Sequence, residues 1–204
     1  MVTIGILIFN DAEELDFVGP YEVFTMARAL IEREKLSLGP FEVSLISPGG
    51  KTVQCAKGMR VEPHRAMEDV SALDVVLVPG GQGTRREVGN EAMLSWIGNI
   101  ARGCKWVTSV CTGSLLLTAA GPARGKRVTT HWGSIELLRG RKEASEVLEN
   151  VRYVRDGNVV TSAGVSAGID MALWVLGQMT SPAFARQVQH AMEYDPAPPY
   201  AAEV

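Results

Sequence analysis

Apolar residues recur along the chain in short continuous runs, separated by longer stretches of mixed polarity. The apolar runs predict strands at Ile4–Phe9, Val43–Ile46, Val75–Val78, Trp106–Val110 and Val159–Thr161. The stretches between several of them predict helices at Tyr21–Glu34, Glu91–Arg102, Ser114–Ala120 and Ile169–Met179. Continuous rather than alternating apolar strands are typical of a sheet that is buried on both faces. We therefore predict an α/β fold, with a doubly wound, mostly parallel sheet sandwiched by helices.

Three of the predicted strands end in residues that are unusual for plain connecting loops. Asp16 and Gly19-Pro20 follow the first strand, Pro79-Gly80-Gly81 follow Val78, and Cys111-Thr112-Gly113 follow Val110. In doubly wound sheets, ligands bind beyond the carboxyl ends of the strands, where the loops turn into helices. We expect these three strand ends to form one site.

Length and charge limit the kind of protein to which this sheet belongs. The chain has 204 residues, 46% of them hydrophobic, which suits one globular domain with a well-buried core. We predict a single domain over 1–204, in which 194–204, with the Pro-rich segment Tyr194–Tyr200, is an extended arm. Because the net charge is only −3 and basic residues are scattered, neither nucleic acid nor a membrane is an expected partner. A small-molecule substrate is expected instead.

The amino-terminal segment and the cysteines favour a cytoplasmic enzyme. Residues 1–10 are apolar but lack a basic leader, and no apolar run approaches the roughly 20 residues that a membrane span needs. Cys55, Cys104 and Cys111 are odd in number and lack CxxC spacing, which argues against a disulfide framework and a zinc site. Since the sequence has neither a phosphate-binding glycine loop nor a ligand cluster, we expect no cofactor and no metal.

Cys111 lies where the strand-like run Trp106–Val110 changes at once into a helix-forming run that starts at Ser114. A nucleophile on such a sharp turn is raised above the sheet, and small neighbours let a substrate approach. The positive end of the helix dipole favours a thiolate, so the position predicts a pKa below that of free cysteine. The alternative is a buried cysteine that only packs. Cys104, in a helix-to-strand loop, and Cys55, in an expected surface turn, are weaker candidates.

Six segments together resemble the ThiJ/PfpI superfamily, which is related to class I glutamine amidotransferases and has a flavodoxin-like fold. They are LDFVGPYEVF at 15–24, VPGGQG at 78–83, SVCTGSLLLTAAG at 109–121, TTHW at 129–132, SAGVSAGIDMAL at 162–173 and EYDPAPPY at 193–200. Within the superfamily they look most like isocyanide (isonitrile) hydratases. The chain departs from the family pattern at Pro122-Ala123, which bears on packing, and in the acidic stretch 11–14, which bears on the substituent of the substrate.

The resemblance implies roles for four residues. Cys111 would be the nucleophile and Asp16 its acidic partner. The backbone amides of Gly81 and Thr112 would form an anion hole, for which the alternative at the glycine is a plain tight turn. The resemblance also implies a homodimer with the active sites near the subunit interface.

Position alone also favours Asp16. A carboxyl group shielded near the sulfur would be partly neutral and could hand a proton to a substrate. The alternative is a cap for a helix that begins near Gly19-Pro20. Glu13 and Glu14 are rival carboxyls that we expect to be solvated, and Asp170, early in a predicted helix, is expected to be structural.

The histidines separate the possible cysteine chemistries. Cys-His-acid hydrolases need a histidine, and the position directly after the cysteine, where some relatives carry it, is Thr112. His131 is the remaining candidate, with a hydrogen-bonded structural role beside Trp132 as the alternative. His64 follows a proline in an expected surface segment, and His190 lies on the last predicted helix.

Three functions remain open. An isocyanide needs one nucleophile and one acid: a thiolate adds to its terminal carbon, a proton goes to its nitrogen, and water resolves the thioimidate to an N-substituted formamide. We therefore predict a cysteine-dependent isocyanide hydratase, a lyase. The alternatives are a glyoxalase-, deglycase- or amidase-like enzyme with the same cysteine, and the sensing domain of an AraC-type regulator, which would need a helix-turn-helix module.

Overall fold

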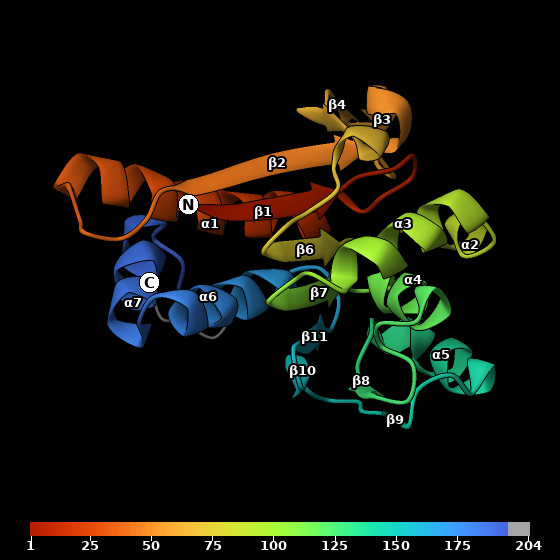
Figure 1. Cartoon of the computed structure of the whole chain (residues 1–204). Helices are drawn as coiled ribbons and strands as arrows, with labels where there is room; N and C mark the ends of the chain where they lie inside the picture. Colours follow the sequence, from red (N-terminus) through yellow and green to blue (C-terminus); the bar gives the residue numbers. More distant parts are fainter. Residues whose placement is uncertain (196–204) are drawn as a thin grey trace.

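The computed structural model describes residues 1–195, which form a central seven-stranded sheet flanked by helices (Figure 1). In spatial order the strands are β10 (Tyr153–Asp156), β11 (Val159–Ser162), β7 (Trp106–Val110), β6 (Val75–Val78), β1 (Val2–Leu7), β2 (Phe41–Ser47) and β5 (Arg65–Ala66). Neighbouring strands are parallel except for β10 and β11. The predicted mostly parallel α/β fold is confirmed. Of the predicted arm 194–204, the part from residue 196 on lies outside the described residues.

The helices and the smaller strands complete the described part of the chain. The helices are α1 (Glu14–Glu34), α2 (Thr84–Glu87), α3 (Glu91–Ala101), α4 (Gly113–Ala120), α5 (Ile135–Arg141), α6 (Ala167–Met179) and α7 (Pro182–Ala191). Short 3₁₀ turns, η1, η2 and η3, span Pro48–Gly50, Met67–Asp69 and Trp132–Ser134. The antiparallel pair of β3 (Val53–Gln54) with β4 (Arg60–Val61) and the parallel pair of β8 (Arg127–Val128) with β9 (Glu146–Val147) stand apart from the main sheet. No helix of the described chain is long and apolar enough to cross a membrane.

The path of the chain through the sheet creates a crevice between β1 and β6. The chain leaves β1 through α1 toward β2, whereas it leaves β6 through α3 toward β7 on the other side. Because such crossovers are right-handed, they place α1 and α3 on opposite faces of the sheet. In agreement, α1 packs against α6 and α7, while α3 packs against α4. The carboxyl ends of β1 and β6 therefore bound the crevice where ligands bind in this class of fold.

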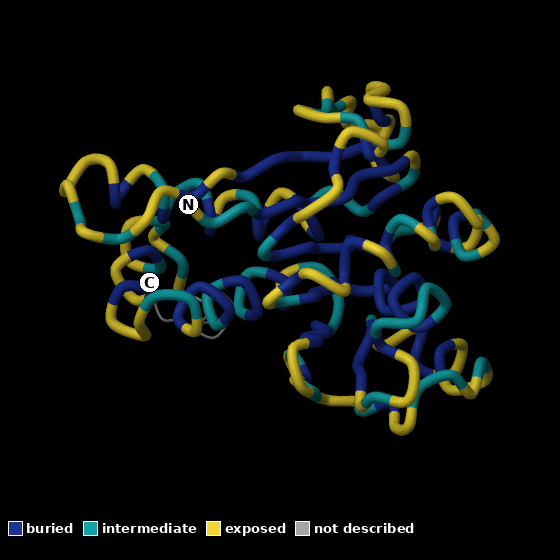
Figure 2. Tube along the Cα trace, in the orientation of Figure 1, coloured by how far each residue is buried: buried dark blue, intermediate teal, exposed yellow. Residues whose placement is uncertain are grey.

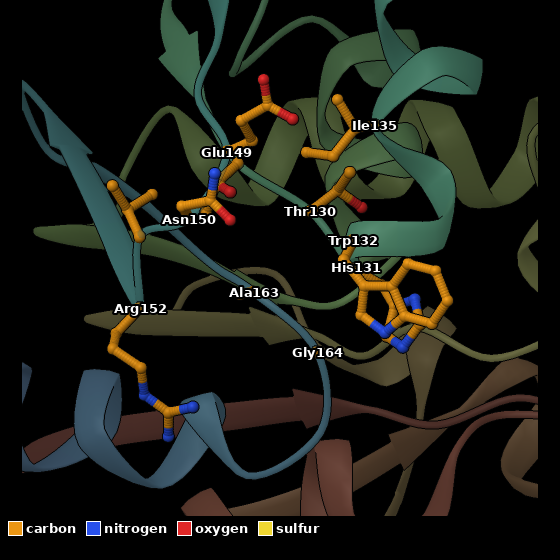
Figure 3. A pocket seen from close by; sticks show the side chains of 11 residues that line it. Thr130, His131, Trp132, Ile135, Glu149, Asn150, Arg152, Ala163 and Gly164 are labelled. Atoms are coloured by element: carbon orange, nitrogen blue, oxygen red, sulfur yellow. The ribbon is translucent and has the colours of Figure 1, made fainter.

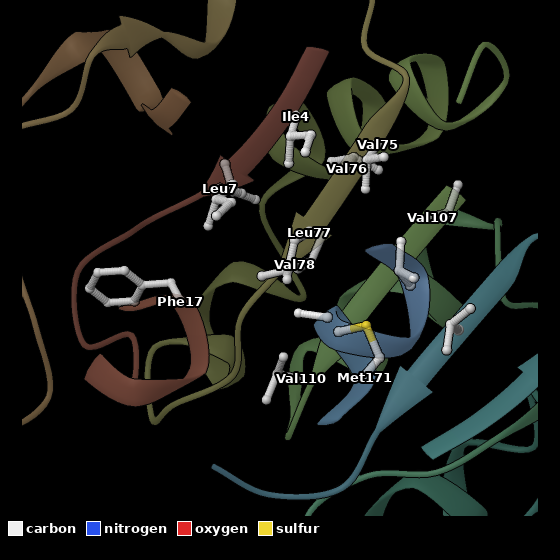
Figure 4. Packing of buried hydrophobic residues seen from close by; sticks show 14 of the residues in the cluster. Ile4, Leu7, Phe17, Val75, Val76, Leu77, Val78, Val107, Val110 and Met171 are labelled. Carbon is white, nitrogen blue, oxygen red and sulfur yellow. The ribbon is translucent and has the colours of Figure 1, made fainter. Parts of the chain in front are cut away.

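The core combines strand residues of the sheet with apolar residues of the helices that cover its two faces (Figure 2). All four residues of β6 are buried, and Phe17 from α1 and Met171 from α6 belong to the same cluster (Figure 4). Each large apolar side chain buried in this way stabilises the fold by about 1.5–3 kcal/mol. This packing fixes the strand ends that carry the candidate site.

The first helix begins seven residues earlier than the predicted Tyr21–Glu34. It starts at Glu14, and Pro20 lies within it. The prediction took proline as a first-turn residue, but the preceding loop is closed by a hydrogen bond from the Glu13 amide to the Gly80 carbonyl (3.0 Å), after which the helix starts at once. Asp16 consequently lies in the first turn of α1, and the alternative that it caps a helix near Gly19-Pro20 is wrong.

Candidate active site

Cys111 occupies a sharp turn between β7 and α4. Its φ is +55°, in the left-handed region that residues with a side chain rarely adopt. The turn is held from several sides, because the Cys111 amide donates to Ser162 and Ala163 (both 3.2 Å) and the Cys111 carbonyl accepts from the Thr130 hydroxyl (2.9 Å). A strained backbone persists only where its surroundings fix it, as they do here. The predicted strand-to-helix turn at Cys111 is present.

Two glycines let the neighbouring strand end approach this turn. A Cβ on Gly113 would lie 2.1 Å from the Val78 carbonyl oxygen, and a Cβ on Gly80 would lie 2.5 Å from the Thr112 nitrogen. Only residues without a side chain fit at these two positions. The end of β6 thus lies directly against the cysteine turn.

Asp16 reaches the same place from α1. It is completely buried, with an exposed fraction of 0%, and its Oδ2 accepts a hydrogen bond from the Gly80 amide (2.9 Å). Its Oδ1 is also buried and has no conventional hydrogen-bond partner among residues 1–195, while the carboxyl group faces the Cys111 thiol. The first helix, the Pro-Gly-Gly turn and the cysteine turn therefore meet at one point.

Asp16 and Cys111 each change the pKa of the other. Burial raises the pKa of Asp16 to about 7, and the charge of Glu13 adds to this, while hydrogen bonds from the Gly80 amide and Cys111 oppose it. Burial likewise raises the pKa of Cys111 to about 12, followed by the negative charge of Asp16. The lowered pKa predicted for Cys111 is therefore wrong, because burial and the neighbouring Asp16 raise the pKa of the thiol more than hydrogen bonds from Thr112 lower it. At neutral pH the sulfur is a thiol beside a carboxyl group that titrates in that range.

The amides predicted for the anion hole lie at the cysteine turn. The Thr112 amide and hydroxyl both interact with the Cys111 sulfur and favour its thiolate form. The Gly81 amide donates to the Thr112 hydroxyl oxygen at 3.0 Å. A substrate anion would compete with that hydroxyl for the Gly81 amide, so the role of the two amides stays a prediction.

His131 lies beside the cysteine turn and lines a cavity of about 410 Å³ together with Trp132 (Figure 3). Its Nδ1 accepts from the Gly133 amide (3.1 Å), its ring lies 5.4 Å from that of Trp132, and it packs over Gly164. None of these contacts involves Cys111. They fit the alternative of a hydrogen-bonded structural histidine.

The rival carboxyls have structural partners. Glu13 forms an ion pair with Lys57, and Glu14 Oε1 accepts from the Lys57 amide (2.7 Å), so these two residues tie α1 to the turn between β3 and β4 instead of being solvated as expected. Asp170 pairs with Arg152 (2.5 Å) and accepts from the Tyr194 hydroxyl (2.8 Å), in line with its expected structural role.

The remaining cysteines and histidines lie elsewhere. Cys55 is buried, not on the surface as expected, and the Cys104 thiol donates to the Ile100 carbonyl (3.3 Å). His64 accepts from the Leu45 amide through Nδ1 (2.9 Å) and stacks on Tyr21. These contacts indicate structural roles.

Sequence reasoning missed Arg85, the second residue of α2. Its guanidinium donates to the Gly81 carbonyl (3.1 Å) and reaches the hydroxyls of Thr84 and Thr112. The signal for it was weak: one basic residue among several, shortly after the Pro-Gly-Gly turn.

The fold and the site together define the class of this protein. It is a flavodoxin-like α/β protein with a cysteine on a strained strand-to-helix turn and a buried carboxyl group beside that cysteine. The sequence model of the DJ-1/PfpI family matches residues 2–178. The chain therefore belongs to the DJ-1/PfpI family, and the resemblance drawn from its motifs is confirmed.

Two curated proteins and one solved structure show which kinds of protein this chain resembles. Isonitrile hydratase of Pseudomonas putida is 39% identical over 197 residues, which cover 97% of this chain and 80% of that protein. The HTH-type transcriptional regulator CdhR of Pseudomonas aeruginosa is 31% identical over 144 residues, 71% of this chain but 42% of the regulator. A THiJ/PfpI family protein from Pseudomonas syringae has a similar crystal structure, with a TM-score of 0.86 and 29% identity, covering 100% of this chain and 79% of that one. Both an enzyme and regulators are thus among its relatives.

Proposed function

We propose that this protein is a cysteine-dependent isocyanide hydratase that converts an isocyanide and water to an N-substituted formamide. The observation that carries the proposal is the buried pair of Cys111 and Asp16, in which the pKa of the carboxyl group is raised to about 7. A group that titrates near neutral pH can both take and return a proton during turnover. The similarity to the hydratase of Pseudomonas putida supports the same reading.

In the first step, sulfur adds to the terminal carbon of the isocyanide. The Cys111 thiol gives its proton to the Asp16 carboxylate as the S–C bond forms. The electron pair released from the C–N triple bond becomes the lone pair of nitrogen, and carbon keeps the lone pair that it already carried. That carbon then takes the proton back from Asp16, which gives the thioimidate R–N=CH–S–Cys111. The first proton therefore ends on carbon, and not on nitrogen as expected from the sequence.

In the second step, water resolves the thioimidate. Its oxygen bonds to the same carbon, the C=N electron pair moves to nitrogen, and nitrogen takes a proton. The C–S bond then breaks, sulfur regains a proton, and the formamide R–NH–CHO leaves. Asp16 is the group placed to move these protons, and no leaving group other than sulfur needs protonation. For this reason the scheme requires no histidine at the sulfur.

Two exposed apolar residues next to Asp16 suggest how the site is enclosed. Leu15 and Val18 flank Asp16 on α1 and are 37% and 39% exposed. We include in the proposal a homodimer in which this part of α1 meets a second copy, since exposed apolar side chains beside a buried site favour such a contact. The three free cysteines fit a reducing compartment, so we place the reaction in the cytoplasm.

A sensing domain is the second candidate, supported by the similarity to regulators. The chain spans 42% to 46% of the length of those curated regulators, so the match concerns one part of them. A sensor would bind its ligand without consuming it. Turnover of an isocyanide therefore distinguishes the hydratase from the sensing domain.

Turnover of an alkyl and an aryl isocyanide by the purified chain tests the proposal. We expect formamide to appear with the wild type, to vanish with Cys111→Ala, to fall at least about 100-fold with Asp16→Asn, and to persist with His131→Ala. Binding without turnover would favour the sensing domain. Hydrolysis of amides that depends on His131 would favour the amidase-like alternative.

A further inference from the structure

Arg85 holds a positive charge beside the cysteine turn. Its Nη1 lies 3.1 Å from the Gly81 carbonyl oxygen, 3.1 Å from the Thr84 hydroxyl and 3.4 Å from the Thr112 hydroxyl. Its Nη2 lies 3.3 Å from the hydroxyl of Ser134, at the end of η3. These contacts fix the guanidinium next to both the Pro-Gly-Gly turn and the cysteine turn.

The charge of Arg85 is not balanced by a carboxylate in the described part of the chain. All of its acceptors there are neutral oxygens. The neighbouring charges, in contrast, are paired: Asp11 with Arg86 (3.0 Å) and Glu13 with Lys57. Much of the charge of the acidic stretch 11–14 is therefore neutralised, and Arg85 is left as a cation that can attract an anion.

The guanidinium also keeps donors for a ligand. It has five N–H groups, of which Nη1 turns two toward the oxygens of the neighbouring turns and Nη2 turns one toward Ser134. The Nε–H and the second proton of Nη2 have no acceptor among the residues that the structure describes. Arginine binds a carboxylate through two parallel N–H donors. Because Arg85 is exposed, a ligand can reach these donors from solvent.

Arg85 lies near the reacting group without being part of it. The Thr112 hydroxyl that it faces belongs to the residue directly after Cys111. A Cβ on Gly80 would lie 2.7 Å from that hydroxyl oxygen and 2.8 Å from the Cβ of Cys111, so all three groups adjoin one point. In an isocyanide, the substituent extends from the nitrogen bonded to the carbon that sulfur attacks. A carboxylate on the first carbon of the substituent is three bonds from the reacting carbon and can meet Arg85.

We propose that Arg85 is a specificity residue, which pairs with a carboxylate on the substituent of the isocyanide. The preferred substrates are isocyanides that carry a carboxylate on the carbon next to nitrogen, as in the isocyano counterparts of amino acids. The inference rests on the proposed hydratase function and names the class of its substrate. Arg85 recognises the substituent and takes no part in the proton transfers assigned to Asp16.

Turnover of isocyanoacetate and of its methyl ester tests the proposal, because the two share the reacting group and differ in charge. Arg85→Met should lower kcat/KM for isocyanoacetate about 30-fold relative to the ester, mainly by raising KM, since a charge-assisted pair is lost. A general structural loss affects both substrates alike and cancels in this ratio. Arg33→Met removes an exposed arginine that pairs with Glu34, and it should leave the ratio unchanged. An unchanged ratio in Arg85→Met, or an equal fall in Arg33→Met, would overturn the proposal.

Binding to Cys111→Ala keeps this test separate from the test of the hydratase. That variant cannot form the S–C bond, so a titration followed by ligand-detected NMR measures binding alone. In the Cys111→Ala background, Arg85→Met should weaken the binding of isocyanoacetate about 30-fold relative to its methyl ester. Equal binding of isocyanoacetate with and without Arg85 would refute the role of Arg85. A wild type that forms no formamide from either substrate would instead refute the hydratase.

Discussion

Replacing Asp16 with Asn should remove most activity and at the same time stabilise the protein at neutral and alkaline pH. The pKa of Asp16 is raised from 3.8 to about 7 in the folded chain, chiefly by burial. Between these values the folded chain holds a proton that the unfolded chain has released, so rising pH favours unfolding. The contribution of Asp16 to stability is fully present below pH 3.8 and is lost as the pH rises through about 7.

The size of this effect follows from the two pKa values. Integrating the linkage from pH 5 to pH 8 gives a loss of about 2.5 kcal/mol from the free energy of unfolding of the wild type. Asn cannot lose a proton and its side-chain oxygen can still accept from the Gly80 amide, so Asp16→Asn should escape this loss. The raised pKa of Cys111, about 12, keeps that thiol neutral over the same window and adds little there.

Urea unfolding at pH 5 and pH 8, at one protein concentration and followed by tryptophan fluorescence, measures the difference. Asp69→Asn makes the same chemical change at an exposed residue, so it should keep the pH dependence of the wild type. A pH dependence that is identical in the wild type and Asp16→Asn, or a wild type that gains stability toward pH 8, would refute the reasoning.

Three further predictions follow from the same geometry. Gly80→Ala should cost about 1–3 kcal/mol of stability and about 100-fold in activity, because its Cβ would lie 2.5 Å from the Thr112 nitrogen. Gly140→Ala, with open space around the added Cβ, should be neutral or stabilising, and thermal melts and turnover assays check both variants. Glu13→Gln should move the rise of kcat/KM with pH to lower pH, because the charge of Glu13 raises the pKa of Asp16, and an unchanged or upward-shifted profile would contradict this. Light scattering at micromolar concentration should give the mass of a dimer. A monomer with full activity would contradict the proposed dimer.

The fold and the place of the site could be predicted because parallel strands leave a simple signal. Continuous apolar runs gave the order of strands and helices, and their carboxyl ends had to meet at one edge. Asp16, the Pro-Gly-Gly turn and Cys111 lie together there, as expected from that rule.

The predictions that failed concern features that depend on contacts between segments far apart in the sequence. The pKa of Cys111 is set by burial and by Asp16, neither of which is visible in the local pattern of a strand and a helix. The start of α1 is set by a hydrogen bond between Glu13 and Gly80, which overrides the usual place of Pro20. Arg85 escaped notice because its partners come from three separate loops.

The most direct test of the central claim is the mass of the enzyme trapped during turnover. After rapid mixing with an isocyanide and quenching in acid, we expect the peptide that contains Cys111 to gain the full mass of the isocyanide, because the addition expels no group. The adduct should be absent from Cys111→Ala. Formamide production by Cys111→Ala, or an adduct found only on Cys55 or Cys104, would contradict the account.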